Sequence, residues 1–316
     1  MSVAIAGGSG GLGRALIEVI QARGTYQVFV LTRKVSGSPE GSGGLHFIAV
    51  DYSDVESLAS TLEKNKIDTV ISAINNITGE NDSEINLIKA AEISAPTKRF
   101  IPSYFGVPYS QEQYENFPPA MAKRSALTAL ESTSLQWTVI YNGFFLDYFG
   151  TPKVKSYMDD VAFFVDIKSN MAAIPGSGEV PVVFTHTFDV GRFIAALLES
   201  HTWAAETYII GDKATFHQVV RLAEEVKGTK FVVAHDSVQD LAACKLTELP
   251  SHRAIYQFYP KEMLHSFLAP FGLECERGQA NLNPGRTLNA EYPDIKPMKL
   301  RDVLELGWGK AAEGTI

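Results

Sequence analysis

The sequence predicts an α/β protein in which a doubly wound parallel sheet is joined to a smaller, discontinuous lobe. Two observations predict this fold. Short apolar runs alternate with amphipathic helical segments through residues 2–141, as in a parallel sheet covered by helices. The first run passes directly into a glycine-rich turn and then a helix. Right-handed crossovers between successive strands leave the doubly wound sheet as the simplest arrangement.

The glycine-rich turn lies in residues 2–14, which read SVAIAGGSGGLGR. Its Gly-x-x-Gly-x-x-Gly spacing differs from the commoner Gly-x-Gly-x-x-Gly fingerprint. Without Cβ atoms the backbone can approach a pyrophosphate, whose charge would lie on free N–H groups at the helix start. A flexible turn before a helix is the alternative interpretation, but it leaves the neighbouring strand unexplained. The segment predicts a Rossmann-type dinucleotide site contacted by Gly7, Ser9, Gly10, Gly11, Leu12 and Gly13.

The end of the second strand favours NADP(H) over NAD(H). NAD-binding domains place an acidic residue about 20 positions after the glycines, whereas this sequence has Arg33 and Lys34. Because a guanidinium binds phosphate in a bidentate manner, Arg33 is the predicted ligand of the 2′-phosphate, with Lys34 beside it. Two solvent-exposed surface cations are the alternative. Further on, Asp51 could accept from the adenine amine or cap the next helix, for which Asp54 is an equally good cap.

The other elements of the first half follow in order. Apolar runs predict strands at residues 26–32, 45–50, 69–74, 99–102 and 137–141. Helical periodicity predicts helices after the glycine turn and at residues 55–63, 84–94 and 120–132. Ligands of parallel sheets lie beyond the carboxyl ends of strands. We therefore expect cofactor contacts from Ala73, Ile74, Asn142 and Phe144, the last two beside the nicotinamide.

Several segments resemble the atypical short-chain dehydrogenase/reductases, and among them the NmrA-like group that includes isoflavone reductases and phenylcoumaran benzylic ether reductases. The matching segments are residues 7–13, Arg33, residues 98–106 (KRFIPSYFG), Lys123 with its helix, and residues 142–149 (NGFFLDYF). Residues 176–198 and 289–304 are similar to the family's return segment and C-terminal helix region.

The resemblance implies that Lys123 serves as the catalytic acid/base or positions a water. The sequence departs from the family where Tyr104 replaces the usual glutamate of Pro-Ser-Glu-Phe-Gly. The Tyr-x-x-x-Lys pair of ordinary short-chain dehydrogenases is absent, since Pro119 stands four residues before Lys123.

Lys123 also makes physical sense as a proton donor. A partly desolvated lysine beside a nicotinamide titrates nearer neutrality and could protonate a developing oxyanion. A solvated helix lysine next to Arg124 is the alternative. Tyr104 and Tyr114 are other candidate donors, and the predicted catalytic pair is Lys123 with Tyr104.

The chain is expected to divide into an NADP-binding Rossmann domain of residues 1–150, to which residues 176–212 return, and a substrate-binding lobe of residues 151–175 and 213–316. Aromatic residues gather around the expected junction. Because pockets at such junctions are mostly apolar, we expect a small aromatic or terpenoid-like substrate, although about half of these side chains should be core. The predicted substrate contacts are Phe105, Phe145, Tyr148, Phe149, Met158 and Phe163.

The second half is expected to hold strands at residues 182–184 and 207–210. Helices are expected at residues 190–199, with Asp189 as its cap, and at residues 216–227.

Composition disfavours several classes of function. A net charge of −8 over 316 residues argues against a nucleic-acid surface. No signal peptide or membrane-spanning run is readable, so we expect a cytoplasmic protein, monomeric or homodimeric. The histidines lack ligand partners at i+2 to i+4, so no metal is expected. Cys244 and Cys275 lack CxxC spacing and are expected to be reduced, buried thiols.

These observations favour an NADPH-dependent reductase that delivers hydride to a C=C, benzylic or carbonyl carbon of an aromatic or conjugated small molecule, as in secondary metabolism. One alternative is a non-catalytic, NADP-sensing regulatory protein of the NmrA-like kind. A redox-neutral isomerase or cyclase that retains the cofactor is another.

Overall fold

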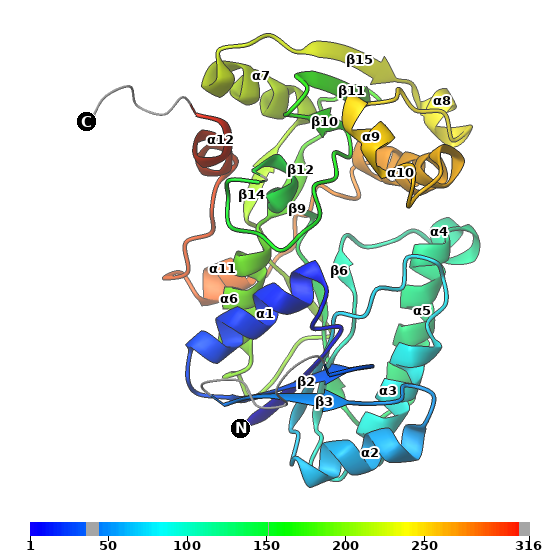
Figure 1. Cartoon of the computed structure of the whole chain (residues 1–316), viewed down its shortest axis with the longest axis vertical. Coiled ribbons are helices and arrows are strands. Elements are labelled where there is room, and N and C mark those ends of the chain that lie inside the picture. The colour runs from blue at the N-terminus through cyan, green and yellow to red at the C-terminus, as the bar shows by residue number, and fades with distance from the viewer. Residues whose placement is uncertain (36–43, 151, 310–316) are drawn as a thin grey trace. The chain divides into compact units, whose positions relative to one another are not determined.

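The computed structural model describes residues 1–35, 44–150 and 152–309. They form two compact units, each built from several stretches of chain (Figure 1). Unit 1 consists of Met1–Tyr141, Val190–Ile209 and Arg286–Ile295, and unit 2 of Asn142–Asp189, Ile210–Gly285 and the residues from Lys296 onward. These boundaries differ from the expected ones: residues 142–150, 176–189 and 210–212 belong to unit 2, and residues 286–295 belong to unit 1.

Unit 1 is built on a six-stranded parallel sheet with the strand order β3-β2-β1-β4-β5-β7. Its strands are β1 (Ser2–Ala6), β2 (Gln27–Thr32), β3 (Leu45–Ala49), β4 (Thr69–Ser72), β5 (Arg99–Ile101) and β7 (Gln136–Trp137). β1 pairs with both β2 and β4, with Ala6 opposite Leu31 on one side and Ser72 on the other. The order reverses between β1 and β4, where ligands of such sheets bind. The predicted Rossmann-type, doubly wound sheet is confirmed.

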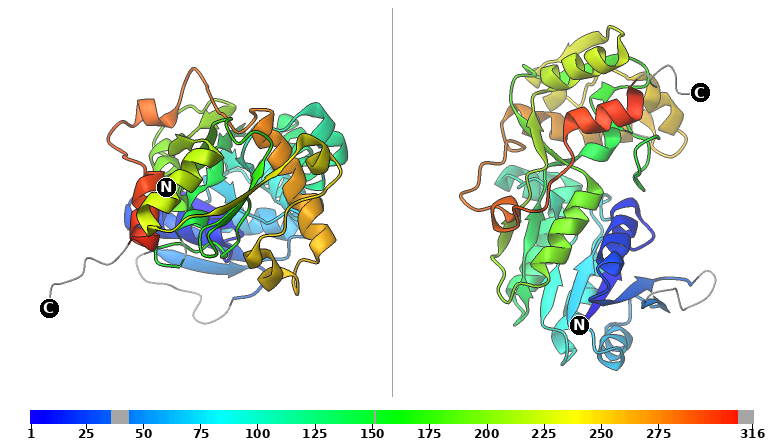
Figure 2. Two further views of the ribbon diagram at one scale, coloured as in Figure 1. Left: turned by 90° about the horizontal axis from the view of Figure 1, so that it is seen from above. Right: turned by 90° about the vertical axis from the view of Figure 1, so that its left-hand side faces the viewer.

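Helices cover both faces of this sheet (Figures 1 and 2). On one face, helices pack on a core that includes Ala6, Phe29 and Phe100. These helices are α2 (Val55–Lys64), α3 (Asp82–Ile93) and α5 (Pro118–Glu131). On the other face lies α1 (Gly11–Ala22), whose apolar stripe is buried as its periodicity predicts. α6 (Thr187–Leu197) lies beside α1, and a Cβ at Gly191 would stand 3.1 Å from Val19 Cβ.

The predicted strand at residues 137–141 is divided between two sheets. Residues up to Trp137 form β7, whereas β8 (Val139–Tyr141) pairs with β6 (Phe105–Gly106) and β13 (Glu206–Tyr208) in a second, three-stranded sheet. The break falls at Thr138, whose hydroxyl lies 2.8 Å from that of Thr207. A buried polar residue therefore interrupts an apolar run that reads as one strand. The short helices α4 (Gln111–Asn116) and α11 (Leu288–Glu291) complete unit 1.

Unit 2 contains two three-stranded sheets with helices. One sheet has β11 (Met171–Pro175) between β10 (Val165–Asp166) and β15 (Val232–Asp236), and the other has β12 (Val182–Thr185) between β14 (Asp212–Ala214) and β9 (Phe144–Phe145). The helical elements are η1 (Leu146–Phe149), α7 (Phe216–Lys227), α8 (Val238–Ala242), α9 (Pro250–Ile255), α10 (Lys261–Glu276) and α12 (Leu300–Trp308). α7 has the predicted bounds because Thr215 and Gln218 form a capping box at its start.

Two expectations about the second half of the chain were wrong. α6 begins at Thr187, three residues earlier than expected, so Asp189 lies inside the helix instead of capping it. The Asp189 carboxylate accepts a hydrogen bond from the Met298 N–H at 2.7 Å. Of the two cysteines, both free, Cys275 is buried as expected but Cys244 is exposed.

Candidate functional site

The glycine turn is packed so closely that the backbone leaves no room for a side chain at Gly7 or at Gly13. Gly7 has a φ of +75°, and a Cβ there would stand 2.3 Å from the Ala73 carbonyl oxygen. A Cβ at Gly13 would stand 2.3 Å from the Gly7 carbonyl oxygen. At Gly10, by contrast, the nearest atom would be 3.4 Å away. The turn therefore packs tightly against the residues after β4 at Gly7 and has space beside Gly10.

The start of α1 leaves backbone donors for an anion. Gly10 is the N-cap, no side chain caps the first turn, and that turn contains no acidic residue. Ser9 and Gly10 are exposed, and Gly11 and Leu12 are half-buried. Unpaired N–H groups and the positive end of the helix dipole favour a phosphate at such a place. The cradle that a Cβ would fill and these free donors fit the predicted dinucleotide pyrophosphate.

Arg33 and Lys34 are both exposed just beyond β2. The Lys34 N–H lies 3.4 Å from the Thr32 hydroxyl. Nearby, the Tyr52 hydroxyl donates to the Leu31 carbonyl at 3.1 Å. Burial raises the pKa of Tyr52, and the Arg33 charge opposes that rise. Arg33 thus lies at the end of β2 near Tyr52, with its side chain exposed in the described part of the chain.

Of the two candidate caps of the second helix, the structure selects Asp54. Asp54 caps α2, accepting from the Ser57 N–H at 2.9 Å. Asp51 instead accepts from the hydroxyl and the N–H of Ser53 at 2.6 and 2.8 Å. Those two hydrogen bonds lower the pKa of Asp51. The carboxylate of Asp51 is therefore an exposed, ionised acceptor and not the helix cap.

Ser103 connects the end of β4 to Lys123. The Ser103 hydroxyl donates to the Ile74 carbonyl at 2.8 Å, and the Ser103 carbonyl accepts from Lys123 Nζ at 2.6 Å. Ile74 follows Ala73, the residue against which Gly7 packs. The structure thus brings together the glycine turn, the residues after β4 and Lys123 in one continuous network.

Lys123 is half-buried on α5, with Nζ 5.5 Å from the centre of the Tyr104 ring. Burial lowers the pKa of Lys123 to about 8, and the Glu84 carboxylate opposes that shift. A lysine with this pKa exists in both protonation states near neutral pH, which is the condition for general acid/base work. The alternative of an ordinary solvated lysine does not describe this environment.

Tyr104, the other predicted catalytic residue, is enclosed by aromatic side chains. It is 1% exposed. Its hydroxyl lies 2.6 Å from that of Tyr114, and its ring meets Tyr141 edge-on at 5.5 Å. Burial raises the pKa of Tyr104. This environment favours Lys123 over Tyr104 as the group that exchanges protons, with Tyr104 as the ring beneath the ammonium.

Sequence reasoning missed a group of buried polar residues around Ser103. Glu84 of α3 is 0% exposed, and its carboxylate accepts from the Ser103 N–H at 2.6 Å and from Asn76 Nδ2 at 3.2 Å. Asn81 Nδ2 donates to the Ala122 carbonyl at 2.6 Å. A signal was present, because Glu84 lies three, four and seven residues before Leu87, Ile88 and Ala91, on the same buried helix face.

In unit 2, Phe163 and five other aromatic rings form a cluster. Tyr148 stacks on Phe163 at 4.8 Å between ring centres. The other rings of the cluster, those of Phe144, Phe145, Phe267 and Phe271, touch Phe163 or its neighbours. Phe267 and Phe271 come from α10 and were not predicted, although their i, i+4 spacing is typical of one helix face. We call these six residues, including Phe163 itself, the Phe163 cluster. All six side chains are partly exposed.

The other predicted ligand contacts lie elsewhere. Phe149 is 7% exposed and packs edge-on against Phe184 at 5.2 Å, which makes it core. Phe105 lies on β6 in unit 1, and Met158, which lies between Tyr148 and Phe163 in sequence, is half-buried. Asn142 is buried; its Nδ2 donates to the Gly143 carbonyl at 3.1 Å, and its Oδ1 has no hydrogen-bond partner among the described residues.

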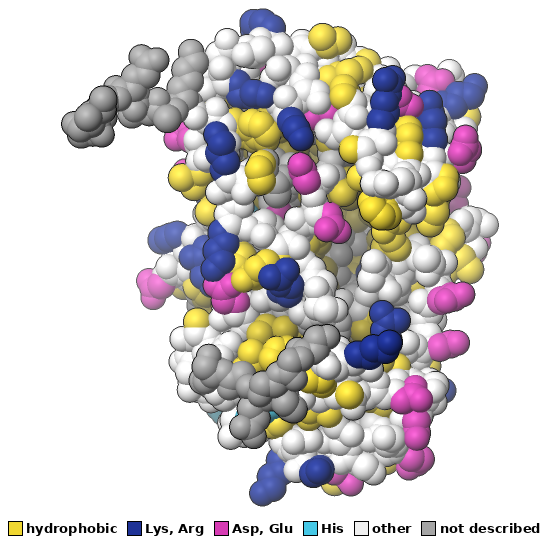
Figure 3. Space-filling view, viewed as in Figure 1, with side chains coloured by type: hydrophobic (Ala, Val, Ile, Leu, Met, Phe, Trp, Pro, Cys, Tyr) yellow, Lys and Arg dark blue, Asp and Glu magenta, His cyan; other side chains and the backbone are white. Residues whose placement is uncertain are grey.

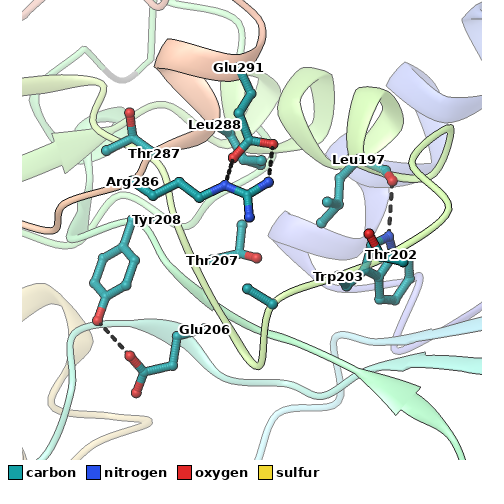
Figure 4. Close-up of a pocket in the computed structure, with 11 residues that line it drawn as sticks. Leu197, Thr202, Trp203, Glu206, Thr207, Tyr208, Arg286, Thr287, Leu288 and Glu291 are labelled. Carbon is teal, nitrogen blue, oxygen red and sulfur yellow. Dashed lines mark hydrogen bonds and ion pairs between the residues drawn. The ribbon is translucent and has the colours of Figure 1, made fainter.

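Unit 1 also contains a pocket of about 30 Å³ between the end of α6, β13 and α11 (Figure 4). Its polar side chains bond to one another: Arg286 Nε lies 2.6 Å from Glu291 Oε1, and Tyr208 donates to Glu206 at 2.9 Å. The volume suits about one or two water molecules. None of the predicted site residues lines it.

On the face shown in Figure 3, basic side chains are interspersed with acidic ones and form no continuous stripe. Within the described part of the chain, no three His, Cys, Asp or Glu side chains are placed to hold a metal ion together. The described helices include none that combines the length and the apolar character needed to cross a bilayer.

Comparison with known proteins places this site in a family. The model of the NmrA-like family matches residues 1–277. Oxidoreductase BOA1 of Botryotinia fuckeliana (strain B05.10) is 34% identical over 93% of this chain and 95% of its own length. Oxidoreductase swnN of Metarhizium robertsii is 30% identical over 97% of both chains.

Solved structures show the same fold. The ternary complex of leucoanthocyanidin reductase from Vitis vinifera aligns with a TM-score of 0.74 at 18% identity, covering 96% of this chain and 98% of that one. A structure of pinoresinol-lariciresinol and phenylcoumaran benzylic ether reductases aligns with a TM-score of 0.74 at 20% identity, covering 97% and 99%. The predicted resemblance is confirmed, and the chain belongs to the NmrA-like family.

Proposed function

We propose that this protein is an NADPH-dependent reductase of an aromatic or conjugated small molecule, and that Lys123 is its proton donor. The observation that carries the proposal is the position of Lys123. Its Nζ is held by the Ser103 carbonyl, it has a pKa of about 8, and it is linked through Ser103 to the residues behind the glycine turn. Relatives named oxidoreductases support the reaction class.

Unit 1 would hold the cofactor. The N–H groups of Gly11 and Leu12 would receive the pyrophosphate, and Arg33 with Lys34 would bind the 2′-phosphate. Backbone atoms of Ala73 and Ile74 would contact the ribose side. NADPH supplies a hydride when bound. The titles of two solved structures support this choice, since one names a leucoanthocyanidin reductase with NADPH and another a pinoresinol reductase with NADP⁺ and pinoresinol.

Lys123 would donate its proton where negative charge develops on the substrate as hydride arrives. Before that step the ammonium is held by the Ser103 carbonyl and by the face of the Tyr104 ring, so its direction is fixed in advance. After the step, a neutral amine is tolerated because the surroundings are desolvated. Asn142 and Phe144 remain the predicted neighbours of the nicotinamide.

The Phe163 cluster of unit 2 would bind the substrate. Partly exposed rings offer stacking and edge-on contacts to an aromatic ligand, at about 0.5–1.5 kcal/mol for each pair beyond the area buried. Of the predicted contacts, Phe145, Tyr148 and Phe163 belong to this cluster. Unit 2 is therefore the proposed substrate-binding lobe.

The test is consumption of NADPH with a panel of aromatic enones, quinones, benzylic ethers and aldehydes. Wild type is compared with Lys123→Ala and with the matched control Arg124→Ala, which removes an exposed cation from the next position of α5. Turnover lost only in Lys123→Ala, with NADPH binding intact, would support the proposal. Tight NADPH binding without turnover of any compound would favour an NADP-sensing protein or a redox-neutral catalyst.

A further inference from the structure

Glu84 is a carboxylate buried in the core of unit 1, on the inner face of α3. A carboxylate removed from water is costly unless hydrogen bonds and an opposite charge compensate it. The hydrogen bonds come from the Ser103 N–H and Asn76. Packing alone gives no reason for a glutamate here, because Leu87 and Ile88 show that the same face accepts apolar side chains.

The Ser103 backbone joins Glu84 to Lys123. The N–H on one side of the Ser103 Cα donates to Glu84 Oε1 at 2.6 Å, and the carbonyl on the other side accepts from Lys123 Nζ at 2.6 Å. The Tyr104 N–H donates to the Pro102 carbonyl at 2.6 Å, so Ser103 is the middle residue of a three-residue turn. Fixing its N–H therefore also fixes the direction of its carbonyl.

The charged and titratable groups around Lys123 come from three neighbouring elements. α3 contributes Glu84, the segment after β5 contributes the Tyr104 ring, and α4 contributes Tyr114, whose hydroxyl bonds to that of Tyr104. On α5 itself Arg124 pairs with Glu131 at 3.4 Å, both exposed. Among the described residues, the carboxylate whose charge acts on Lys123 is Glu84.

We propose that Glu84 is a positioning residue of this site: through the Ser103 backbone it aims the carbonyl that holds the Lys123 ammonium, and its charge keeps that ammonium protonated within a buried network. The inference rests on the proposed role of Lys123 as proton donor. Because Glu84 is 0% exposed, it would act through Ser103 and Lys123.

The test measures the titration of Lys123 directly, without cofactor or substrate. The protein is labelled with a trace of acetic anhydride across a pH series. Mass spectrometry then reads the extent of acetylation at Lys123 against the exposed Lys64 as internal reference. Wild type should show a midpoint near pH 8. Glu84→Gln keeps the shape but removes the charge, so the midpoint should move to lower pH by about one unit.

Asp82→Asn is the matched control, since it removes one negative charge from the exposed first turn of the same helix and should leave the midpoint in place. A folded Glu84→Gln protein with the wild-type midpoint would overturn the proposal and leave Glu84 a structural residue.

If Glu84→Gln does not fold, Lys123→Met supplies the second measurement. That variant leaves the Glu84 carboxylate buried without its cation, whereas Arg124→Met removes an exposed cation from the next position of α5. The Tm should therefore fall more in Lys123→Met than in Arg124→Met. Equal losses of Tm in the two variants would refute the coupling.

The labelling result is independent of turnover. If wild type reduces no compound but Glu84→Gln moves the Lys123 midpoint, the proposed function fails and the positioning role stands. If wild type is an active reductase and Glu84→Gln does not move the Lys123 midpoint, the proposed function stands and the positioning role of Glu84 fails.

Discussion

Lys123 Nζ lies 2.6 Å from the carbonyl oxygen of Ser103, a backbone acceptor that no substitution of the Ser103 side chain can remove. A neutral acceptor of this kind orients the ammonium without holding its proton as tightly as a carboxylate would. Lys123 is thereby kept in place and remains able to release its proton.

The first prediction concerns Lys123 itself. Lys123→Ala should lower kcat by about 10²- to 10⁴-fold, the usual contribution of a general acid, while the Kd for NADPH stays within about twofold. Arg124→Ala should retain wild-type kcat. Steady-state kinetics together with a fluorescence titration of NADPH check both values. Equal losses of kcat in Lys123→Ala and Arg124→Ala would show that turnover depends on the charge of the helix surface and not on the Lys123 proton.

The pH dependence follows from the pKa of about 8. A proton donor must be charged to act, so kcat for reduction should be level below pH 7 and fall about tenfold for each unit above pH 8. In Lys123→Arg the guanidinium stays protonated over this range. Any residual activity of that variant should then be independent of pH from 7 to 9, which a pH profile of kcat tests.

The third prediction concerns Arg33, the proposed ligand of the 2′-phosphate. Arg33→Ala should weaken NADPH binding by about 10- to 100-fold, as expected for the loss of a charge-assisted, bidentate contact. NADH binding should be unchanged because NADH has no 2′-phosphate. Isothermal titration calorimetry of wild type and variant with NADPH and with NADH gives the four dissociation constants to compare. Wild type that binds NADH as tightly as NADPH would contradict the assignment.

The glycine turn should tolerate no side chain at Gly13. Gly13→Ala puts a Cβ 2.3 Å from a backbone oxygen, so either the turn moves or the protein loses stability, on the order of 2 kcal/mol or more. Gly285→Ala is the matched control, because a Cβ there meets nothing within 4 Å. Urea unfolding compares the two. A Gly13→Ala protein of wild-type stability and NADPH affinity would exclude this geometry.

Two phenylalanines of unit 2 should behave differently. Phe149→Ala removes a core ring and should cost about 3–5 kcal/mol of stability with little change of KM. Phe267→Ala removes a partly exposed ring of the Phe163 cluster and should raise KM for an aromatic substrate with a smaller loss of stability. Kinetics and thermal unfolding separate the two effects. A KM that rises in neither variant would place the substrate elsewhere.

Much of unit 1 was predictable because each element carries its own local signal. The β1 run, the glycine turn and the helix that follows need no distant contact to be recognised. The break at Thr138 and the early start of α6 at Thr187 depend on contacts with residues distant in sequence. Such long-range contacts leave no periodicity in the sequence, so the predicted boundaries were displaced there.

The glycine turn was predictable because its spacing is tied to its chemistry, whereas Lys123 was reached through the family resemblance. Glu84 was missed although it shares a helix face with Leu87 and Ile88, because a glutamate in the first turn of a helix is usually a solvated residue that favours the helix dipole. The ring partners Phe267 and Phe271 were missed for another reason. They lie more than 100 residues from Phe163 in sequence, and only the folding of unit 2 brings them to it.

Two of the three links that meet at Ser103 are made by its N–H and carbonyl, which every residue other than proline possesses. A substitution of Ser103 can therefore remove the hydrogen bond from its hydroxyl to the Ile74 carbonyl and leave the hydrogen bond from Lys123 to its main-chain carbonyl intact. Evolution can therefore substitute residue 103 as long as the main-chain conformation there is preserved. For the proposed proton transfer, the main-chain geometry at position 103 therefore matters more than the side chain there.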